Sequence, residues 1–240
     1  RCRSCRRNCR TARTFWGKHL SQKQQQSLRQ QSNTEIAYNA TYLLDKHDII
    51  GGISFDRNAV VHYGGLEDTI VNDGHRDSLF HRYNNFDVHL GYANLVEEGT
   101  NFSYAPTIKY GFYNDNRGAL EHNIGVNIPL KYTFSDKTAF KFNASADFAK
   151  FENHVRTFWN NLVVLHPAFV YNGSTLDLNV GVKPTFGKDG QFYFLPDVKA
   201  KVNIVDNGFS IHGGVVGNVN RNTFEALSSY NPYMLSDYLL

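Results

Sequence analysis

Strict alternation of apolar and polar residues between Leu120 and Phe134 is the feature that most constrains the fold. Every second residue from Leu120 is apolar except His122, and the residues between them are polar or small except Pro129. Successive side chains of a β-strand point to opposite faces, so this pattern gathers the apolar side chains on one face. It predicts a long strand in a sheet with one apolar and one polar face.

The same alternation recurs along most of the chain. It is clear in residues 36–44, 86–92, 140–148, 176–183, 198–204 and 209–220, and weaker in 49–63 and 158–171. We count about ten strands, most about 12 to 16 residues long, whereas strands of soluble proteins usually have about 5 to 6 residues. A tilted membrane strand needs about 9 to 11 residues. The lengths predict an all-β fold, an up-and-down antiparallel transmembrane β-barrel.

The connections between the strands form a second pattern. Tight turns rich in Asn, Asp, Gly and Ser are expected at 45–48, 97–100, 135–138, 172–175 and 205–208. The alternate connections tend to be longer, at 64–84, at 151–157 and from Arg221 onward, with short exceptions at 114–118 and 187–191. Alternate connections of a meander lie at the same end, so one end is expected to be tight and the other looped, as in outer-membrane barrels.

The composition agrees with this fold. The chain has 14 Tyr and 18 Phe but 6 Pro and 1 Met, and its mean hydropathy is −0.44. No run approaches the roughly 18 to 20 apolar residues of a helical span, and half of each barrel strand can be polar. Aromatic residues towards strand ends are expected to form interfacial girdles. They are Phe102, Tyr104, Tyr110, Phe112, Tyr132, Phe134, Phe140, Phe151, Trp159, Tyr171, Phe186 and Phe192.

The first 33 residues differ from the rest. They hold nine Lys or Arg and no Asp or Glu, which leaves 16 basic and 22 acidic residues in 34–240. We therefore expect a disordered, separately folded or non-native tail at 1–33, a β-barrel segment at 34–240, and no nucleic-acid partner. Cys2, Cys5 and Cys9 lie in this tail with His19 as the nearest fourth ligand. A zinc site wants four ligands, commonly as two close pairs, so a non-native terminus is the preferred interpretation.

Three stretches carry a family resemblance: FNASADFAKF at 142–151, the segment from TLDLNVGV to KAKVNI at 175–204, and NRNTFEALSSYNPYM at 220–234. Their texture resembles Gram-negative outer-membrane barrels, in particular TonB-dependent-receptor-type barrels of Bacteroidota. The resemblance covers about residues 34–240. It implies an outer-membrane transport or uptake channel or receptor, here without a visible plug domain.

Both ends of the sequence predict an internal part of a longer barrel. The chain opens with arginines and has no apolar h-region of a signal peptide. Residues 236–240 follow a loop-like Asn231-Pro232 and do not form a final strand with a terminal aromatic residue.

Several His, Asp and Ser residues suggest catalytic or metal sites, but a solvated polar loop or surface explains them better. His62, His75 and His81 flank a predicted loop with Asp68, Asp73 and Asp77, but lack a fixed metal-binding spacing. The pairs Ser78 with His81 and Ser210 with His212 have no nucleophile-elbow motif and no third member. His89 and His212 fall on the polar side of strands, and His122 falls on the apolar side. We expect no enzyme, no cofactor and no metal.

The polar positions of the strands are the candidate pore-lining set. They are Asp87, Glu121, Asn123, Lys131, Lys141, Asp147, Asp177, Lys183, Lys199 and Lys201. Mixed charge of this kind wets a lumen and tunes its selectivity. The expected partners are membrane lipid or lipopolysaccharide, a small-molecule substrate and other envelope proteins. The alternatives are a soluble or surface-attached β-sheet binding protein and, third, a barrel enzyme.

Overall fold

The computed structural model describes residues 31–44, 46–61, 80–94, 101–205 and 208–234. Eleven strands, one 3-10 turn and one helix make up these residues. The elements are β1 Gln31–Leu43, β2 His47–Val61, β3 Phe80–Asn94, β4 Phe102–Tyr104, β5 Thr107–Asp115, β6 Leu120–Ser135, β7 Thr138–Glu152, β8 Thr157–Asn172, β9 Leu176–Phe186, η1 Lys188–Gly190, β10 Phe192–Val205, β11 Phe209–Val216 and α3 Phe224–Tyr230.

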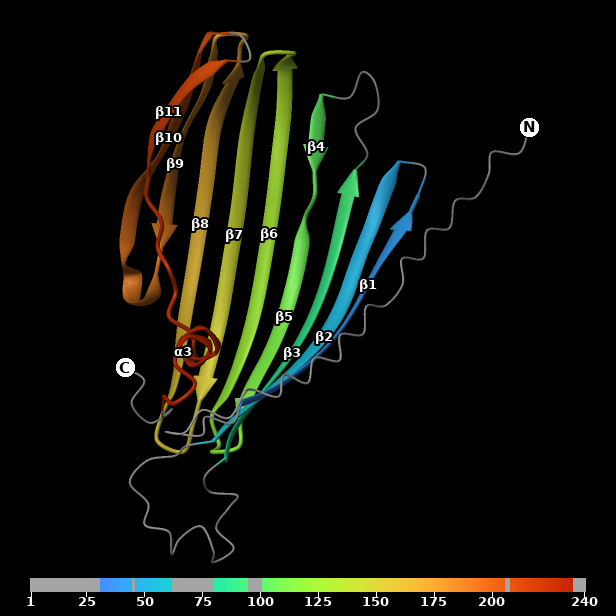
Figure 1. The fold of residues 1–240 in the computed structure, drawn as a ribbon, viewed down its shortest axis with the longest axis vertical. Coiled ribbons are helices and arrows are strands. Elements are labelled where there is room, and N and C mark those ends of the chain that lie inside the picture. Colours follow the sequence, from blue (N-terminus) through green and yellow to red (C-terminus); the bar gives the residue numbers. More distant parts are fainter. Residues whose placement is uncertain (1–30, 45, 62–79, 95–100, 206–207, 235–240) are drawn as a thin grey trace, which may run out of the picture.

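All eleven strands belong to one antiparallel sheet whose order follows the sequence (Figure 1). Each long strand pairs with the next one along the chain. The prediction of an all-β, up-and-down antiparallel sheet is therefore confirmed. Across the described residues the sheet is not closed, because no ladder joins β1 to β11.

The strand expected after residue 101 is divided in two. β4 and β5 both pair with β6, and Ala105 and Pro106 separate them. Proline has no backbone N–H to donate to a ladder, so the regular pairing stops there. The carbonyl of Pro106 still accepts the N–H of Tyr92 at 3.0 Å, and Ala105 donates to the Pro129 carbonyl at 3.2 Å. The two pieces together act as one of the ten long strands that the alternation predicts.

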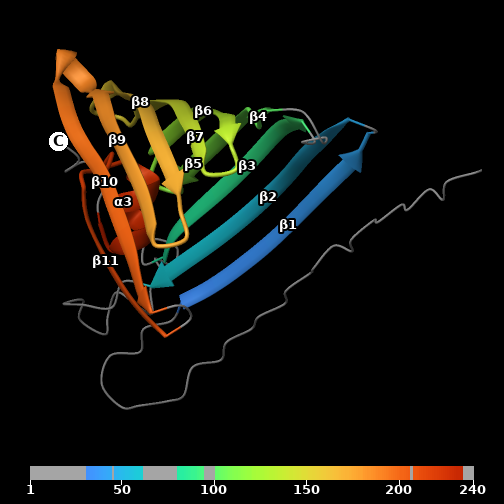
Figure 2. The same cartoon turned by 90° about the horizontal axis from the view of Figure 1, so that it is seen from above.

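The sheet is strongly curved, and α3 lies inside its concave face (Figure 2). Residues directly opposite one another in an antiparallel ladder point to the same side. The register thus assigns Ile124 and its partner Phe148 to the convex face, and Asn123 and its partner Ala149 to the concave face. Most of the exposed large apolar side chains of β1–β11 lie on the convex face; Ile36, Ile53, Leu90, Ile108, Ile128, Phe169, Val180, Val198, Ile211 and Val215 are examples.

Most of the aromatic residues of the predicted girdles lie on the convex face, whereas one lies on the concave face. Their role as interfacial girdles remains a prediction. Near the 135–138 turn, Tyr132 contacts Phe134 with ring centroids 5.0 Å apart, and Phe102 contacts Tyr104 at 5.9 Å. Phe151 instead points into the concave face, where it is 1% exposed. Its odd position on β7 belongs to the inward series, which outweighs its place near the strand end.

His122 stays on the apolar face, as its position in the alternation predicts. Its ring lies 5.3 Å from that of Phe112 and 6.1 Å from that of Tyr110. The hydroxyl of Tyr110 lies 2.8 Å from Nδ1 of His122, within hydrogen-bond range. This bond supplies a polar partner and explains how a histidine is accommodated among apolar side chains.

The difference in loop length between the two ends is smaller than expected. β3 begins at Phe80, so the predicted loop that ended at 84 stops earlier, and residues 62–79 lie outside the described residues. The expected longer connection at 151–157 is wrong. β7 continues to Glu152, and Asn153 closes a four-residue turn by accepting the N–H groups of Val155 and Arg156 at 2.9 and 2.8 Å. An Asn side chain that binds the backbone two residues on favours such a turn.

Two further boundaries differ from the sequence prediction. β1 begins at Gln31, three residues before the expected junction at Thr34 and thus inside the predicted tail, which was expected to end at 33. The segment after Arg221 was expected as loop, but Thr223 starts a short helix by accepting the N–H of Ala226 at 3.1 Å. Threonine is a favoured N-cap residue, which accounts for the start of α3.

Candidate functional site in the concave face

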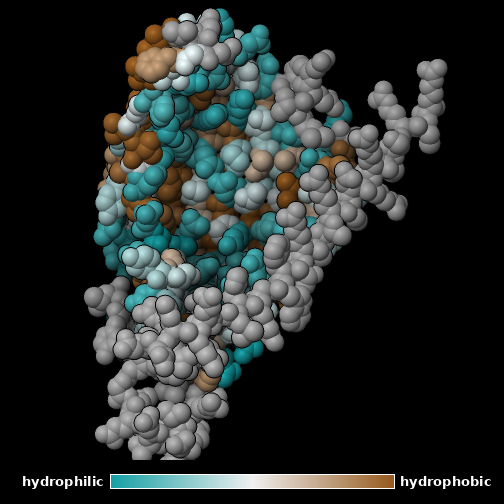
Figure 3. Space-filling view, in the orientation of Figure 1, coloured by the Kyte–Doolittle hydropathy of each residue, from teal (hydrophilic) through white to brown (hydrophobic). Residues whose placement is uncertain are grey.

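All ten predicted pore-lining residues lie on one face of the sheet. Lys131 is directly opposite Lys141, Asp177 is opposite Lys201, and Lys199 is opposite Asn179. Glu121 is opposite Phe151, which packs near α3, so the shared face is the concave one. Figure 3 shows a hollow lined largely by hydrophilic residues. Their function as a pore lining remains a prediction.

The chain crosses this concave face after β11. Lys183 on β9 donates to the Gly217 carbonyl at 3.3 Å and to Oδ1 of Asn218 at 2.7 Å. Further along, the side chain of Asn160 on β8 donates to the Asn222 carbonyl at 2.9 Å. The segment 217–223 thus passes from the β9–β11 side of the sheet towards β6 and its neighbours.

Arg221 joins this segment to the sheet in two places. Its guanidinium donates to the Asn160 carbonyl on β8 and to Oδ1 of Asn123 on β6, both at 3.2 Å. The planar fork of donors on Arg suits such a divided contact. Asn123, one of the predicted pore-lining residues, therefore binds the segment 217–223 through Arg221.

Glu121 binds the start of α3. Its Oε2 accepts the N–H of Phe224 at 2.6 Å, and its Oε1 accepts from the Asn123 amide at 2.8 Å. The first N–H groups of a helix have no partner within the helix, and a carboxylate there also meets the positive end of the helix dipole. Glu121 is 2% exposed, so its two side-chain oxygens are satisfied by these contacts and not by bulk water.

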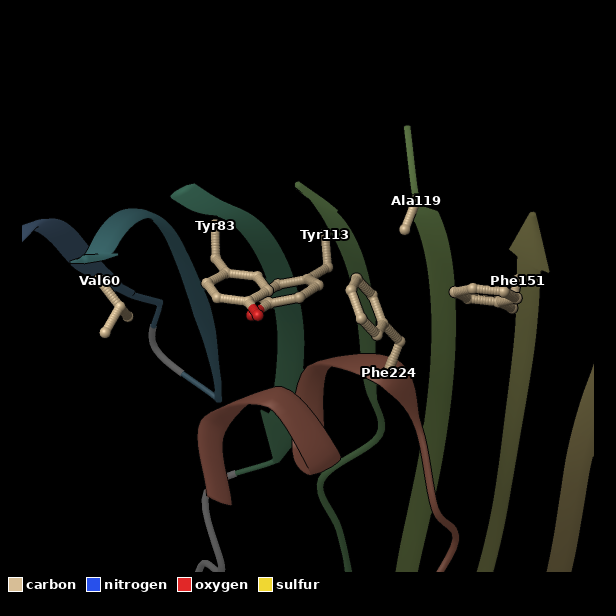
Figure 4. Close-up of a cluster of buried hydrophobic side chains, with 6 residues drawn as sticks. All are labelled: Val60, Tyr83, Tyr113, Ala119, Phe151 and Phe224. Atoms are coloured by element: carbon tan, nitrogen blue, oxygen red, sulfur yellow. The ribbon is translucent and has the colours of Figure 1, made fainter. Parts of the chain in front are cut away.

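Phe224 is the apolar anchor of α3 (Figure 4). Its ring is 1% exposed and lies 5.4 Å from the rings of Tyr113 and Phe151 and 6.1 Å from that of Tyr83. Val60 and Ala119 complete this buried cluster. The cluster draws on β2, β3, β5, β7 and the β5–β6 connection, and the ring of Phe224 contacts rings from three of these strands, β3, β5 and β7.

Two tyrosine hydroxyl groups also bind the chain that follows β11, residues 217–234, which we call the C-terminal segment. The hydroxyl of Tyr113 lies 2.7 Å from Oγ of Ser228, and Ser228 donates to the Phe224 carbonyl at 2.7 Å. Tyr83 can donate to the Pro232 carbonyl at 2.9 Å. Side chains from β3 and β5 thereby extend the contact past the end of α3.

His81 is placed by a strand and not by the loop that the sequence suggested. It lies on β3, fully buried, with Nε2 2.9 Å from Oδ2 of Asp115 and Nδ1 2.8 Å from the Tyr83 hydroxyl. Oδ1 of Asp115 accepts the N–H groups of Arg117 and Ala119, which fixes the β5–β6 turn. His81 therefore has a structural environment next to the α3 contact. Its proposed loop partners His62, His75, Asp68, Asp73, Asp77 and Ser78 lie outside the described residues.

Charge is divided between the two sides of the concave face. Asp56, Asp87 and Glu121 lie near Glu225 of α3, with Lys109 3.0 Å from Oδ1 of Asp87. Burial, and then the neighbouring Asp87, raises the pKa of the Glu225 carboxyl above its ordinary value; Glu121 and Asp56 add to this and Lys109 opposes it. We call this side, formed by β2, β3, β5 and β6, the acidic wall.

The opposite side, formed by β9, β10 and β11, is the basic wall. Its concave-face residues include Lys183, Lys199, Lys201 and His212, with Asp177 and Asp197 as the acidic groups. Asp197 is 2% exposed and is approached by Nζ of Lys199 at 3.2 Å and by Nε2 of His166 at 2.8 Å.

Gly181 allows the contact between His166 on β8 and Asp197 on β10. It lies on the intervening strand, opposite both Ala168 and Asp197. A Cβ at Gly181 would meet the Ala168 Cβ at 2.9 Å and Nε2 of His166 at 3.1 Å. The absent side chain leaves room for His166 to reach across β9.

The remaining sequence candidates do not assemble into a reactive site. Ser210 and His212 lie on the concave face of β11, and neither is hydrogen-bonded to the other among the described residues. No cluster of His, Cys, Asp or Glu in this part of the chain could hold a metal ion. Cys2, Cys5, Cys9 and His19 fall outside the described residues.

Several residues of the site were not predicted from the sequence, among them Tyr83, Tyr113, His166, Asp197, Arg221, Phe224 and Ser228. The signal for α3 was present in Thr223 followed by the spaced Phe224 and Leu227. The signal for Asp197 was its place in the polar series of β10. Nothing local marks Tyr83 or Tyr113 as contacts of a segment more than a hundred residues away.

No protein-family model matches the chain, and no curated protein sequence matches it. None of the helices that the structure describes is long and apolar enough to cross a membrane.

Proposed function

We propose that the chain forms part of the wall of a Gram-negative outer-membrane β-barrel, a transport or uptake channel or receptor of the TonB-dependent-receptor type. The convex face would contact membrane lipid or lipopolysaccharide. The concave face would line a water-filled lumen that the C-terminal segment narrows. A small solute and other envelope proteins are the expected partners.

The exposed apolar convex face is the observation that carries the proposal. Side chains such as Ile128, Leu90 and Val180 are 37%, 54% and 43% exposed, on strands distributed across the sheet. Soluble proteins rarely expose a continuous apolar surface of this extent. In a lipid bilayer, exposure of such a face carries no hydrophobic free-energy penalty.

Strand length and polarity agree with this assignment. β6, β7 and β8 have 16, 15 and 16 residues, more than the roughly 9 to 11 that a tilted membrane strand needs. Alternation of outward apolar with inward polar residues is the pattern of membrane barrels.

The open edges of the sheet at β1 and β11 extend the same proposal. Unpaired N–H and C=O groups are costly in hydrocarbon, so a sheet spans a bilayer only when its edges are paired. The proposal therefore includes further strands that pair with β1 and β11 and complete the barrel.

Two neighbouring substitutions on β6 test the proposal. Ile128 points to the convex face and Asn127 to the concave face, so Ile128→Lys and Asn127→Lys add the same charge to opposite sides. A lysine on the lipid face near the midplane costs about 2 to 4 kcal/mol. We expect Ile128→Lys to reduce the yield of full-length protein in the outer-membrane fraction, and Asn127→Lys to leave it nearly unchanged.

The alternative functions predict other results. A soluble or surface-attached binding protein would be recovered without detergent and would be absent from the outer-membrane fraction. Equal effects of the two lysines would also contradict the proposal, because they would show that the two faces share one environment.

A further inference from the structure

The basic wall contains a hollow of about 430 Å³ that the C-terminal segment leaves open. It lies over β8–β11. Its lining includes residues of two neighbouring rows across these strands: Asn172, Asp177, Lys201 and His212 in one row, and Val170, Asn179, Lys199 and Gly214 in the next.

Two observations give the hollow its chemistry. Lys199, Lys201 and His212 supply N–H donors, three groups that carry or can carry positive charge, against the one carboxylate of Asp177. Val216, 42% exposed, supplies most of the valine surface beside them, and Val170, 8% exposed, adds a smaller part. The site therefore offers charge to an anionic group and an apolar contact to the body that bears it.

Lys201 is the central cation of the hollow. Its partners in the ladder are Asp177 on one side and His212 on the other. Among the described residues no carboxylate lies within ion-pair distance of its ammonium group, whereas Lys199 already contacts Asp197 at 3.2 Å. Lys201 is thus the lysine of the hollow whose ammonium group is best placed to pair with an added anion.

Gly214 shapes the space beside Lys199. A Cβ at this position would lie 2.4 Å from the Val198 carbonyl oxygen and 3.2 Å from Cγ of Lys199. Only glycine fits where β11 approaches β10 so closely. The row that contains Lys199 is consequently left without a side chain from β11.

We propose that this hollow is a binding subsite for a small organic carboxylate, with the carboxylate on Lys201 and His212 and its apolar body over Val170 and Val216. The acidic wall across the concave face bears the opposite charge, which favours the basic wall for such a ligand. As a transport subsite it rests on the proposed function, because only a lumen would bring a solute there. Binding itself does not depend on where the protein resides.

Binding of benzoate to the purified full chain tests the subsite, with benzyl alcohol as the uncharged analogue and inorganic phosphate as the anion without an apolar body. We expect benzoate to bind more tightly than either. Lys201→Gln should weaken benzoate binding about tenfold, a loss in the range of a charge-assisted hydrogen bond. Lys201→Arg should retain most of it.

Lys141→Gln is the matched control, since Lys141 shares the concave face but lies on β7, outside the hollow. It should change benzoate binding less than twofold. Near-ultraviolet circular dichroism equal to that of the original chain would show that Lys201→Gln is folded.

Three results would overturn the subsite: no binding of benzoate, equal binding of benzyl alcohol, or equal weakening by Lys141→Gln and Lys201→Gln. The last would indicate attraction by the net charge of the whole face. Since binding is measured on purified protein, these results are distinct from a failure to find the chain in the outer membrane.

Discussion

The acidic and basic walls of the concave face are built from the same alternating strands, yet α3 packs only against the acidic wall and its neighbour β7. There, inward aromatic residues and Glu121 bind α3 and the residues around it. On the basic wall the inward positions of β9–β11 include Lys183, Lys199 and Lys201 as well as Gly181 and Gly214, and a hollow remains. The comparison shows that the strand pattern makes a two-faced sheet, while the choice of inward residues decides which part of it binds α3.

Removal of the Phe224 ring should have the largest effect on the packing of α3 against the sheet. Phe224→Ala takes away a ring that is 1% exposed, a change that costs about 3 to 5 kcal/mol in a protein core. A helix of seven residues is not stable alone, so amide protection in α3 reports its contact with the sheet. We expect hydrogen exchange to show loss of this protection.

Tyr230→Ala is the control within the same helix. Tyr230 is 92% exposed, so its removal should leave the exchange of α3 nearly unchanged. Similar loss of protection in both variants would mean that α3 does not depend on the Phe224 contact.

Removal of the Glu121 carboxylate at the start of α3 should have the next largest effect on amide protection in α3. Glu121→Gln removes the carboxylate that accepts the Phe224 N–H, and hydrogen bonds to charged groups contribute about 1.5 to 3 kcal/mol. The amides at the start of α3 should exchange faster by the corresponding factor. Glu152→Gln, an exposed carboxylate on β7 paired with Lys150, should have no such effect; if it does, general electrostatics and not the helix contact is responsible.

A smaller loss is expected from one hydroxyl group. Tyr113→Phe removes the contact with Ser228 and should cost about 1 kcal/mol, seen as faster exchange in the last turn of α3. Tyr110→Phe removes a hydroxyl from the same strand that faces His122 on the convex side. Exchange in α3 should not respond to it, and a response equal to that of Tyr113→Phe would contradict the assignment of the two faces.

The pH dependence of the α3 contact should be the smallest effect. The docked state raises the pKa of Glu225 above its ordinary value of 4.5, mainly through burial. Docking therefore disfavours the ionised form: the penalty is fully present above the raised pKa and disappears as the pH falls towards 4.5. After correction for intrinsic exchange rates, protection of α3 should rise on acidification.

Glu225→Gln isolates this group, because it removes the charge and keeps an acceptor for Asn85. The variant should be better protected than the original chain at pH 7 and equally protected near pH 4.5. A variant with lower protection at pH 7 would show that the ionised carboxylate stabilises the contact.

The sequence was sufficient for the strands because the alternation is local. The strand at Leu120–Ser135 and the inward position of Lys199 follow from a period of two. Curvature, the β8–Asp197 contact over Gly181 and the position of α3 depend on residues distant in the chain. Phe151 illustrates the limit: its aromatic character suggested an interface, and only the position of α3 shows why a large ring belongs inside.

Accessibility along β6 tests the central claim, that the convex face meets lipid and the concave face meets water. Single cysteines at residues 123–131, in a chain with Cys2, Cys5 and Cys9 replaced by serine, can carry a spin label in lipid vesicles. We predict that oxygen, which concentrates in lipid, relaxes labels at Ile124, Val126, Ile128 and Leu130 most strongly. A water-soluble nickel chelate should instead favour Asn123, Asn127 and Lys131. Equal access of the nickel chelate to both sets would contradict the account.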